Sequence, residues 1–202
     1  MWARGAAIRP VPSYAIVERR IIDLVEEDLT GDEEQAEARL DAAFVRFETT
    51  QPALAERLSS VLARPLDETA LALGYFLGIA IFLTFERQFG ARLGAVDETA
   101  LRATDEALNL EEQLRAARTE EHVEVEDVIA QEQPSIMAFL HENEEAALEA
   151  AEGPADTAAP RDVDVDDVHV VYRTMLVITL CLSHAVEPQP GATQRGGSEL
   201  LA

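Results

Sequence analysis

The chain has 202 residues, of which 48% are hydrophobic, 27% charged and only 5% aromatic, and its formal net charge is −23. This length suits one well-buried domain, and the composition favours a helical bundle over a β-sandwich. Because so negative a surface repels phosphate backbones, the charge argues against direct nucleic-acid binding. Ordinary cytoplasmic acidity, adaptation to high salt and imitation of a nucleic acid all remain open as reasons for the charge.

The N-terminus and the cysteine content bear on the compartment. Cys181 is the only cysteine, so the chain cannot form an internal disulfide or a thiolate metal cluster. Residues 1–13 contain arginines and prolines but no apolar run of the kind found in secretory signals. We therefore expect a cytoplasmic protein with a flexible leader over residues 1–12.

Two amphipathic helices are predicted next. Ser13 is a suitable N-cap for a helix that runs to about Leu29, with apolar residues at helical spacing. Thr30 followed by Glu33 has the pattern of a capping box, which predicts that a second helix starts there. Gln51-Pro52 ends that helix, because proline disfavours helical geometry in the residue before it.

The next two helices differ in their polarity. The first carries an apolar stripe that includes Leu54 and Leu58, and it stops at Pro65. The second is capped by Asp67, and its stretch from Thr69 to Phe85 contains no charge. A helix this apolar is predicted to be buried on nearly every side.

The same order of elements recurs in the second part of the chain. Asn109 with Glu112 repeats the capping-box pattern, Gln133-Pro134 repeats the break, and an apolar helix follows from about Asp166 to Ala185. The spacing between copies is constant for the pairs Gln51/Gln133, Leu54/Ile136 and Leu58/Leu140. This pattern indicates an internal duplication.

The fold that we predict is therefore all-α. It is a single-domain helical bundle over residues 13–186, built from a duplicated helix set (30–89 and 109–185) around two apolar central helices that pack together. Residues 152–161 are expected to form a surface loop and 187–202 a disordered tail. Alternation of valine and acid at 122–126 and 162–166 also leaves room for a minor two-stranded ribbon.

Aligning Tyr75 with Tyr172 compares the two central helices directly. Gly74 and Gly78 then correspond to Val171 and Met175, so we expect the glycines to permit close approach and the second copy to supply the bulk. The same alignment places polar residues at equivalent ends of the two helices. These candidate site residues are Glu86, Arg87, Ser183 and His184.

No enzymatic signature accompanies this polar cluster. The sequence has no nucleophile elbow, no phosphate-binding Gly-Lys loop and no zinc-binding His-Glu-x-x-His motif. No catalytic residue, metal ligand or cofactor-binding residue is predicted, and an enzyme is disfavoured. We also expect no membrane association, because a central core helix explains the apolar stretches with fewer exceptions.

These observations favour a non-catalytic acidic helical protein that acts through protein-protein interaction or self-association, with an unknown protein partner or a homo-oligomer as its target. Two alternatives remain. One is a helical bundle that binds a metal through carboxylates or binds a small molecule. The other is a nucleic-acid mimic that inhibits a DNA-binding protein.

Overall fold

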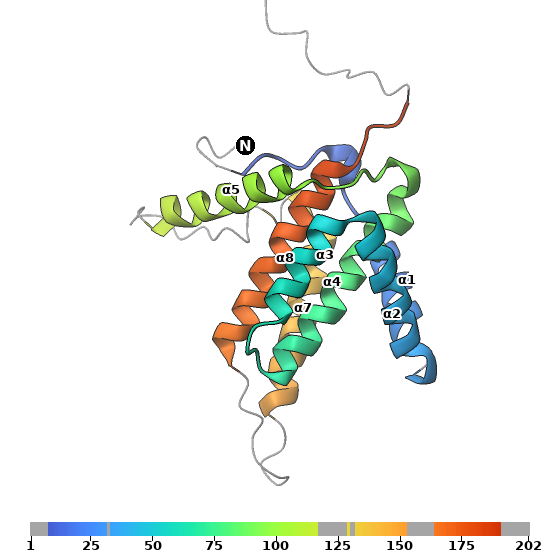
Figure 1. Cartoon of the computed structure of the whole chain (residues 1–202), viewed down its shortest axis with the longest axis vertical. Helices are drawn as coiled ribbons and strands as arrows, with labels where there is room; N and C mark the ends of the chain where they lie inside the picture. Colours follow the sequence, from blue (N-terminus) through green and yellow to red (C-terminus); the bar gives the residue numbers. More distant parts are fainter. Residues whose placement is uncertain (1–7, 32, 117–128, 130–131, 153–163, 191–202) are drawn as a thin grey trace, which may run out of the picture.

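The computed structural model describes residues 8–31, 33–116, 129, 132–152 and 164–190. These residues form the α-helices α1 (Arg19–Thr30), α2 (Glu33–Thr50), α3 (Pro52–Leu62), α4 (Glu68–Phe89), α5 (Glu98–Ala116), α7 (Pro134–Glu152) and α8 (Val165–Ala185) (Figure 1). Two short 3-10 helices, η1 (Ser13–Ala15) and η2 (Gly90–Arg92), complete the set. Over these ranges the chain is helical and packed, as the sequence predicts.

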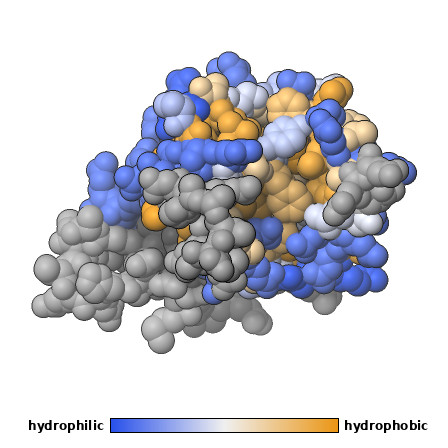
Figure 2. All heavy atoms as spheres, turned by 90° about the horizontal axis from the view of Figure 1, so that it is seen from below, coloured by the Kyte–Doolittle hydropathy of each residue, from blue (hydrophilic) through white to orange (hydrophobic). Residues whose placement is uncertain are grey.

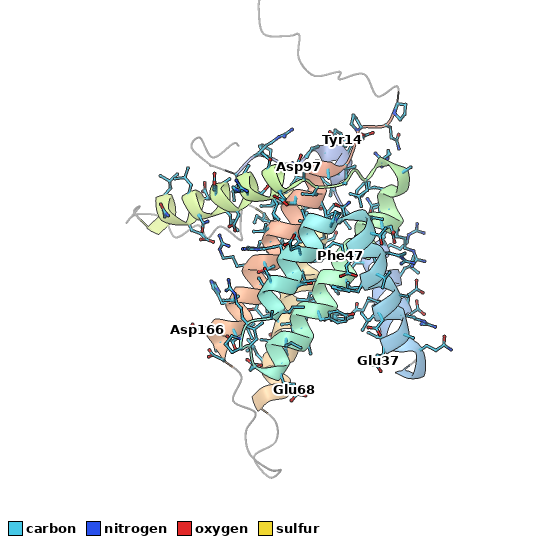
Figure 3. The ribbon with its side chains drawn as sticks, viewed as in Figure 1. Tyr14, Glu37, Phe47, Glu68, Asp97 and Asp166 are labelled. Carbon is cyan, nitrogen blue, oxygen red and sulfur yellow. The ribbon has the colours of Figure 1, made fainter. Side chains whose placement is uncertain are left out.

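Helices α4 and α8 form the centre of the bundle and make its most extensive helix-helix contact. Their first turns lie side by side: the Asp67 amide donates to Asp167 Oδ2 at 2.8 Å, and the Asp164 amide donates to Asp67 Oδ2 at 3.1 Å. Figure 3 places Glu68 and Asp166 at the same end of the molecule. The two apolar helices are therefore parallel neighbours, which confirms the predicted packing.

Local chemistry explains why both helices start where they do. The Asp67 carboxylate accepts the Ala70 amide at 2.8 Å, and the Asp164 carboxylate accepts the Asp166 amide at 2.9 Å. Each aspartate thus satisfies one of the amides that a helix leaves unpaired at its N-terminus. The predicted cap at Asp67 is confirmed.

The two glycines of α4 are places of close helix approach. A Cβ atom at Gly74 would lie 2.9 Å from Leu62 Cδ2 and 3.2 Å from Val171 Cγ1, and one at Gly78 would lie 2.6 Å from Leu58 Cδ2. The bulk at Gly78 thus comes from α3 of the same repeat and not from Met175 as expected. The glycines accommodate α3, with α8 joining only at Gly74.

The likeness between the two halves of the chain also includes segments that precede residues 30 and 109. Helix α1 follows a connecting segment that contains Ala15, the last residue of η1, and Val17, and α5 follows one that contains Gly94 and Val96. Figure 3 shows Tyr14 and Asp97, which precede these two helices, at the end of the bundle opposite Glu68 and Asp166. We therefore define the first repeat as residues 15–90 and the second as 94–186.

The glutamines of the two Gln-Pro breaks bind the segments that precede α1 and α5. Gln133 accepts the Val17 amide at 3.0 Å and donates to the Ala15 carbonyl at 2.8 Å. Gln51 accepts the Val96 amide at 2.9 Å and donates to the Gly94 carbonyl at 2.9 Å. Each side-chain amide, which we call a glutamine clamp, imitates a neighbouring β-strand by pairing with residues i and i+2.

The clamps interleave the two repeats. Gln51 of the first repeat holds the segment before α5, and Gln133 of the second repeat holds the segment before α1. Helix α1 also packs against α7, and α5 packs against α3. Since each repeat completes the other, the two copies form one domain and not two.

The structure corrects several predicted helix boundaries. Thr30 is the last residue of α1 and its hydroxyl donates to the Glu26 carbonyl, so it does not cap α2. Asn109 lies inside α5 and its side chain accepts from Arg173. Ser13 begins a 3-10 turn, and α1 starts at Arg19. Capping patterns misled here because these polar side chains bond to neighbouring turns or to another helix.

The described part of the predicted flexible leader, residues 8–12, is packed against the bundle. Within residues 8–12, Ile8 and Val11 are buried in the core, and the Val11 amide donates to Glu132 Oε2 at 2.9 Å. At the other end, the Glu187 amide donates to the Arg92 carbonyl at 2.7 Å. Residues 1–7, the ribbon segment 122–126, most of the expected surface loop 152–161 and the tail from 191 lie outside the described residues.

Candidate functional site

The four predicted polar residues lie at equivalent ends of α4 and α8, but their contacts do not join them into one cluster. Glu86 and Arg87 face α1 and α2, where Glu86 Oε2 lies 3.4 Å from Arg46 Nη2 and Arg87 pairs with Asp28. Ser183 and His184 instead face the N-terminal segment and the start of α7. The prediction therefore divides into two separate sites.

The environment of Ser183 and His184 is structural. Ser183 is buried, donates to the Thr179 carbonyl at 2.7 Å and accepts from Gln133 at 2.9 Å. Burial lowers the pKa of His184, and the nearby Arg9 charge lowers it further, although a bond with the Arg9 backbone opposes the shift. Because the Ser183 hydroxyl donates to the backbone, this pair has no nucleophile-base hydrogen bond.

Glu86 and Arg87 line a pocket of about 560 Å³ between α1, α2 and α4. Its remaining wall is contributed by Val25, Asp28, Leu29, Arg39, Ala42, Ala43, Arg46 and Leu83. A volume of this size falls in the range of small-molecule sites in proteins. Three of the sixteen arginines of the chain meet here, although the protein as a whole is strongly acidic.

The face that α2 turns to this pocket follows helical spacing. Arg39, Ala42, Ala43 and Arg46 stand at positions i, i+3, i+4 and i+7, which share one side of a helix. The two alanines leave room between the arginines. The arrangement is therefore a hollow bounded at both ends by guanidinium groups.

A separate polar network connects α3, α5 and α8. Asp105 accepts from Arg173 Nη1 at 2.9 Å and from Arg57 Nη2 at 3.4 Å, while Arg173 also bonds Glu112 at 3.2 Å. An open depression of about 390 Å³ between α3 and α5 borders this network. Because these opposite charges pair with one another across three helices, we interpret the network as one that stabilises the fold.

Helix α5 carries an exposed apolar face. Leu110 is 48% exposed and Leu114 is 36% exposed, and the two are four residues apart on one side of the helix. Figure 1 shows α5 crossing α8, with its C-terminal end extending beyond the neighbouring helices. We call Leu110 and Leu114, together with the exposed Glu106 one turn earlier, the α5 face.

Metal sites and membrane-spanning helices are two further classes of feature that bear on function. Over the described residues no group of three or more His, Cys, Asp or Glu side chains is placed to hold a metal ion. The segments Glu68–Arg92 and Val165–Ala185 are long and apolar enough to cross a membrane, and 56% and 72% of their most apolar windows are buried in the bundle. Core helices of soluble proteins meet the same criterion.

Comparison with known proteins finds no matching family model, no matching curated protein and no matching solved structure. The site is therefore described from its own residues. Sequence reasoning identified Glu86 and Arg87 but missed their ion-pair partners Arg46 and Asp28 and the pocket residue Arg39. The arginine and alanine spacing on α2 was a readable signal, whereas the fold alone brings α1 and α4 opposite it.

Proposed function

We propose that this chain is a non-catalytic acidic helical protein that binds a positively charged protein partner through the α5 face. The observation that carries the proposal is the pair of exposed leucines, Leu110 and Leu114, on a helix that extends from a chain of net charge −23. Exposed apolar residues bordered by polar ones are typical of protein-protein contacts. The compartment that we propose is the cytoplasm.

Charge favours a basic partner over a second copy of the chain. Two molecules of charge −23 repel each other, whereas a positively charged partner is attracted over the Debye length of about 10 Å at 0.1 M salt. Figure 2, which views the molecule from below the orientation of Figure 1, shows hydrophobic side chains at the surface beside hydrophilic ones, so this strongly acidic chain still exposes apolar side chains. Apolar contact can therefore supply affinity while charge supplies selectivity.

The described residues support the alternative functions to different extents. A metal site built from carboxylates has no supporting cluster in the described ranges. Small-molecule binding is supported by the arginine-lined pocket between α1, α2 and α4. Imitation of a nucleic acid stays a prediction, because no particular arrangement of the described acids favours it.

The test uses the wild-type chain and a Leu110→Ser/Leu114→Ser variant as matched baits in native cell lysate. A partner of basic composition should be retained by the wild type and lost by the variant. The retained protein is then purified and titrated calorimetrically, where we expect at least about tenfold weaker binding to the variant and weaker binding to both at high salt.

A Val45→Ser variant provides the control, because Val45 is 59% exposed on α2, away from α5. It should retain the partner. Loss of binding by the control, direct binding that survives the double substitution, or a wild-type dimer that the double substitution dissolves would each contradict the proposal. The last result would instead support self-association.

A further inference from the structure

We propose that the pocket between α1, α2 and α4 binds a small amphipathic carboxylate, with the carboxylate on Arg46 and the apolar body on the pocket floor. This inference does not depend on the α5 face. It assigns a ligand class to a cavity whose charged residues also link α1, α2 and α4.

The floor of the pocket is apolar. Val25 and Leu29 of α1 and Ala43 of α2 are each no more than 3% exposed, and Leu83 of α4 is half-buried beside them. A cavity of about 560 Å³ with such a floor accepts a hydrocarbon body and excludes water from it. The apolar part of a ligand would therefore supply most of the binding free energy.

The rim provides hydrogen-bond donors. The Arg46 side chain is 56% exposed. Its Nη2 atom lies 3.4 Å from Glu86 Oε2, which is long for a charge-assisted hydrogen bond. Arg39 donates to the Asp28 carbonyl at 2.6 Å and to Gln35 at 3.3 Å, which uses only part of its five N–H groups. Guanidinium groups pair with carboxylates through two parallel bonds, so both arginines have donors left for an anionic head.

Some of the charges that line the pocket are absent from the equivalent positions that the structure describes in the second repeat. Under the alignment of the two repeats, Asp28 corresponds to Ala107, Glu86 to Ser183 and Arg87 to His184. Ser183 and the Leu83 equivalent, Leu180, are fully buried, so this position in the second repeat is closed. The edge between α5 and α8 therefore packs without the charges that Asp28, Glu86 and Arg87 bring to the first repeat.

The test titrates the full chain with sodium decanoate below its micelle-forming concentration, followed by calorimetry and by NMR of the alanine methyl groups. Decanol serves as the neutral probe and acetate as the anion without an apolar body. We expect decanoate to bind and to shift the Ala42 and Ala43 signals. Decanol should bind at least about tenfold more weakly, and acetate should not bind measurably.

Two substitutions should act in opposite directions. Arg46→Gln should weaken decanoate binding about tenfold or more and leave decanol binding unchanged, since only the anionic head loses a partner. Glu86→Gln should tighten decanoate binding, because it removes the carboxylate that competes for Arg46. Both positions are partly exposed, and circular dichroism verifies that the variants fold.

The controls are Arg20→Gln and Glu37→Gln, which make the same charge changes at exposed positions outside the pocket. They should leave decanoate binding within about twofold of the wild type. The proposal is overturned if decanoate fails to bind, if decanol binds equally well, or if Arg20→Gln weakens binding as much as Arg46→Gln. Methyl shifts confined to residues outside the pocket would overturn it as well.

Discussion

The two repeats share a plan of helices and differ at their outer edges. In the first repeat the edge formed by α1, α2 and α4 is open, and Asp28, Glu86 and Arg87 line it. In the second repeat the equivalent positions of α8 hold Ser183, which is buried, and His184, which is half-buried. The two sets of helices thus agree at the buried positions that define the fold and differ at these edge positions, and the open edge is where we propose that a ligand binds.

The two glutamine clamps differ in the number of their hydrogen bonds and in the burial of those bonds. Gln133 is fully buried and makes a third bond, to Ser183, whereas the bond from Gln51 to Gly94 is only partly buried. The clamped segment before α1 is also held on its other side by Gln88, which accepts the Glu18 amide at 2.9 Å and donates to the Ile16 carbonyl at 2.8 Å. The segment before α5 uses backbone instead, since the Gly94 amide donates to the Ala185 carbonyl.

The largest effect is expected at the clamps. Gln133→Met keeps the side-chain volume but leaves the buried Val17 amide and Ala15 carbonyl without partners, which should cost roughly 3–5 kcal/mol of unfolding free energy. Gln51→Met should cost less, roughly 2–3 kcal/mol, because one of its two bonds is only partly buried. Urea denaturation at neutral pH measures both.

Gln113→Met on the exposed side of α5 is the matched control and should change the unfolding free energy by less than about 0.5 kcal/mol. Equal losses for Gln133→Met and Gln51→Met would show that the two clamps are energetically equivalent. Losses as small as that of the control would show that neither clamp contributes to stability.

Overpacking at Gly78 should have the next largest effect. A side chain there meets Leu58, which is fully buried, so Gly78→Leu should lower the unfolding free energy by roughly 1–3 kcal/mol. Adding Leu58→Ala should recover part of this loss, and a double-mutant cycle measures the recovery. Strict additivity would mean that Gly78 does not accommodate α3. Ala72→Leu, at an exposed position of the same helix, should be nearly neutral.

The ion pairs between the repeats should have smaller effects. Asp105, which binds both Arg57 and Arg173, is 30% exposed, and Asp105→Asn should cost roughly 1–2 kcal/mol. Glu142 pairs with Arg19 across α1 and α7 but is 56% exposed, so Glu142→Gln should cost less than about 1 kcal/mol and lose its effect in 1 M NaCl. Denaturation at low and high salt compares the two variants, and a larger loss for Glu142→Gln would contradict this ranking.

Much of the core was predictable from the sequence. The uncharged run from Thr69 to Phe85 required a buried helix, and the Gln-Pro breaks located the ends of α2 and the starts of α3 and α7. Capping patterns were less reliable: Asp67 caps α4, but Thr30 ends α1 instead of starting α2. Local hydrogen bonds of this kind compete with capping, and only the tertiary structure decides between them.

The clamps and the pocket could not be predicted in the same way. Gln51 and Gln133 were noticed only as neighbours of proline, because their partners lie 43 or more residues away along the chain. The correspondence of α1 with α5 was missed because equivalent positions such as Val25 and Thr104 differ both in residue type and in burial. The pocket depends on three helices meeting, which no local pattern encodes.

The smallest expected effect concerns His184, whose equivalent in the first repeat is the exposed Arg87. Burial lowers the pKa of His184 below its ordinary value of 6.5, so the unfolded chain takes up a proton there before the folded chain does. The folded state should therefore lose stability as the pH falls through 6.5, and regain it as the pH rises. The carboxylates titrate in every variant, so the His184 contribution is obtained as the difference between the wild type and His184→Gln from pH 7.5 to 5.5. The exposed His169→Gln serves as control, and its pH profile should parallel the wild type. If His184→Gln also parallels the wild type, the histidine is not held neutral, and the second repeat is more open at this edge than its buried Ser183 indicates.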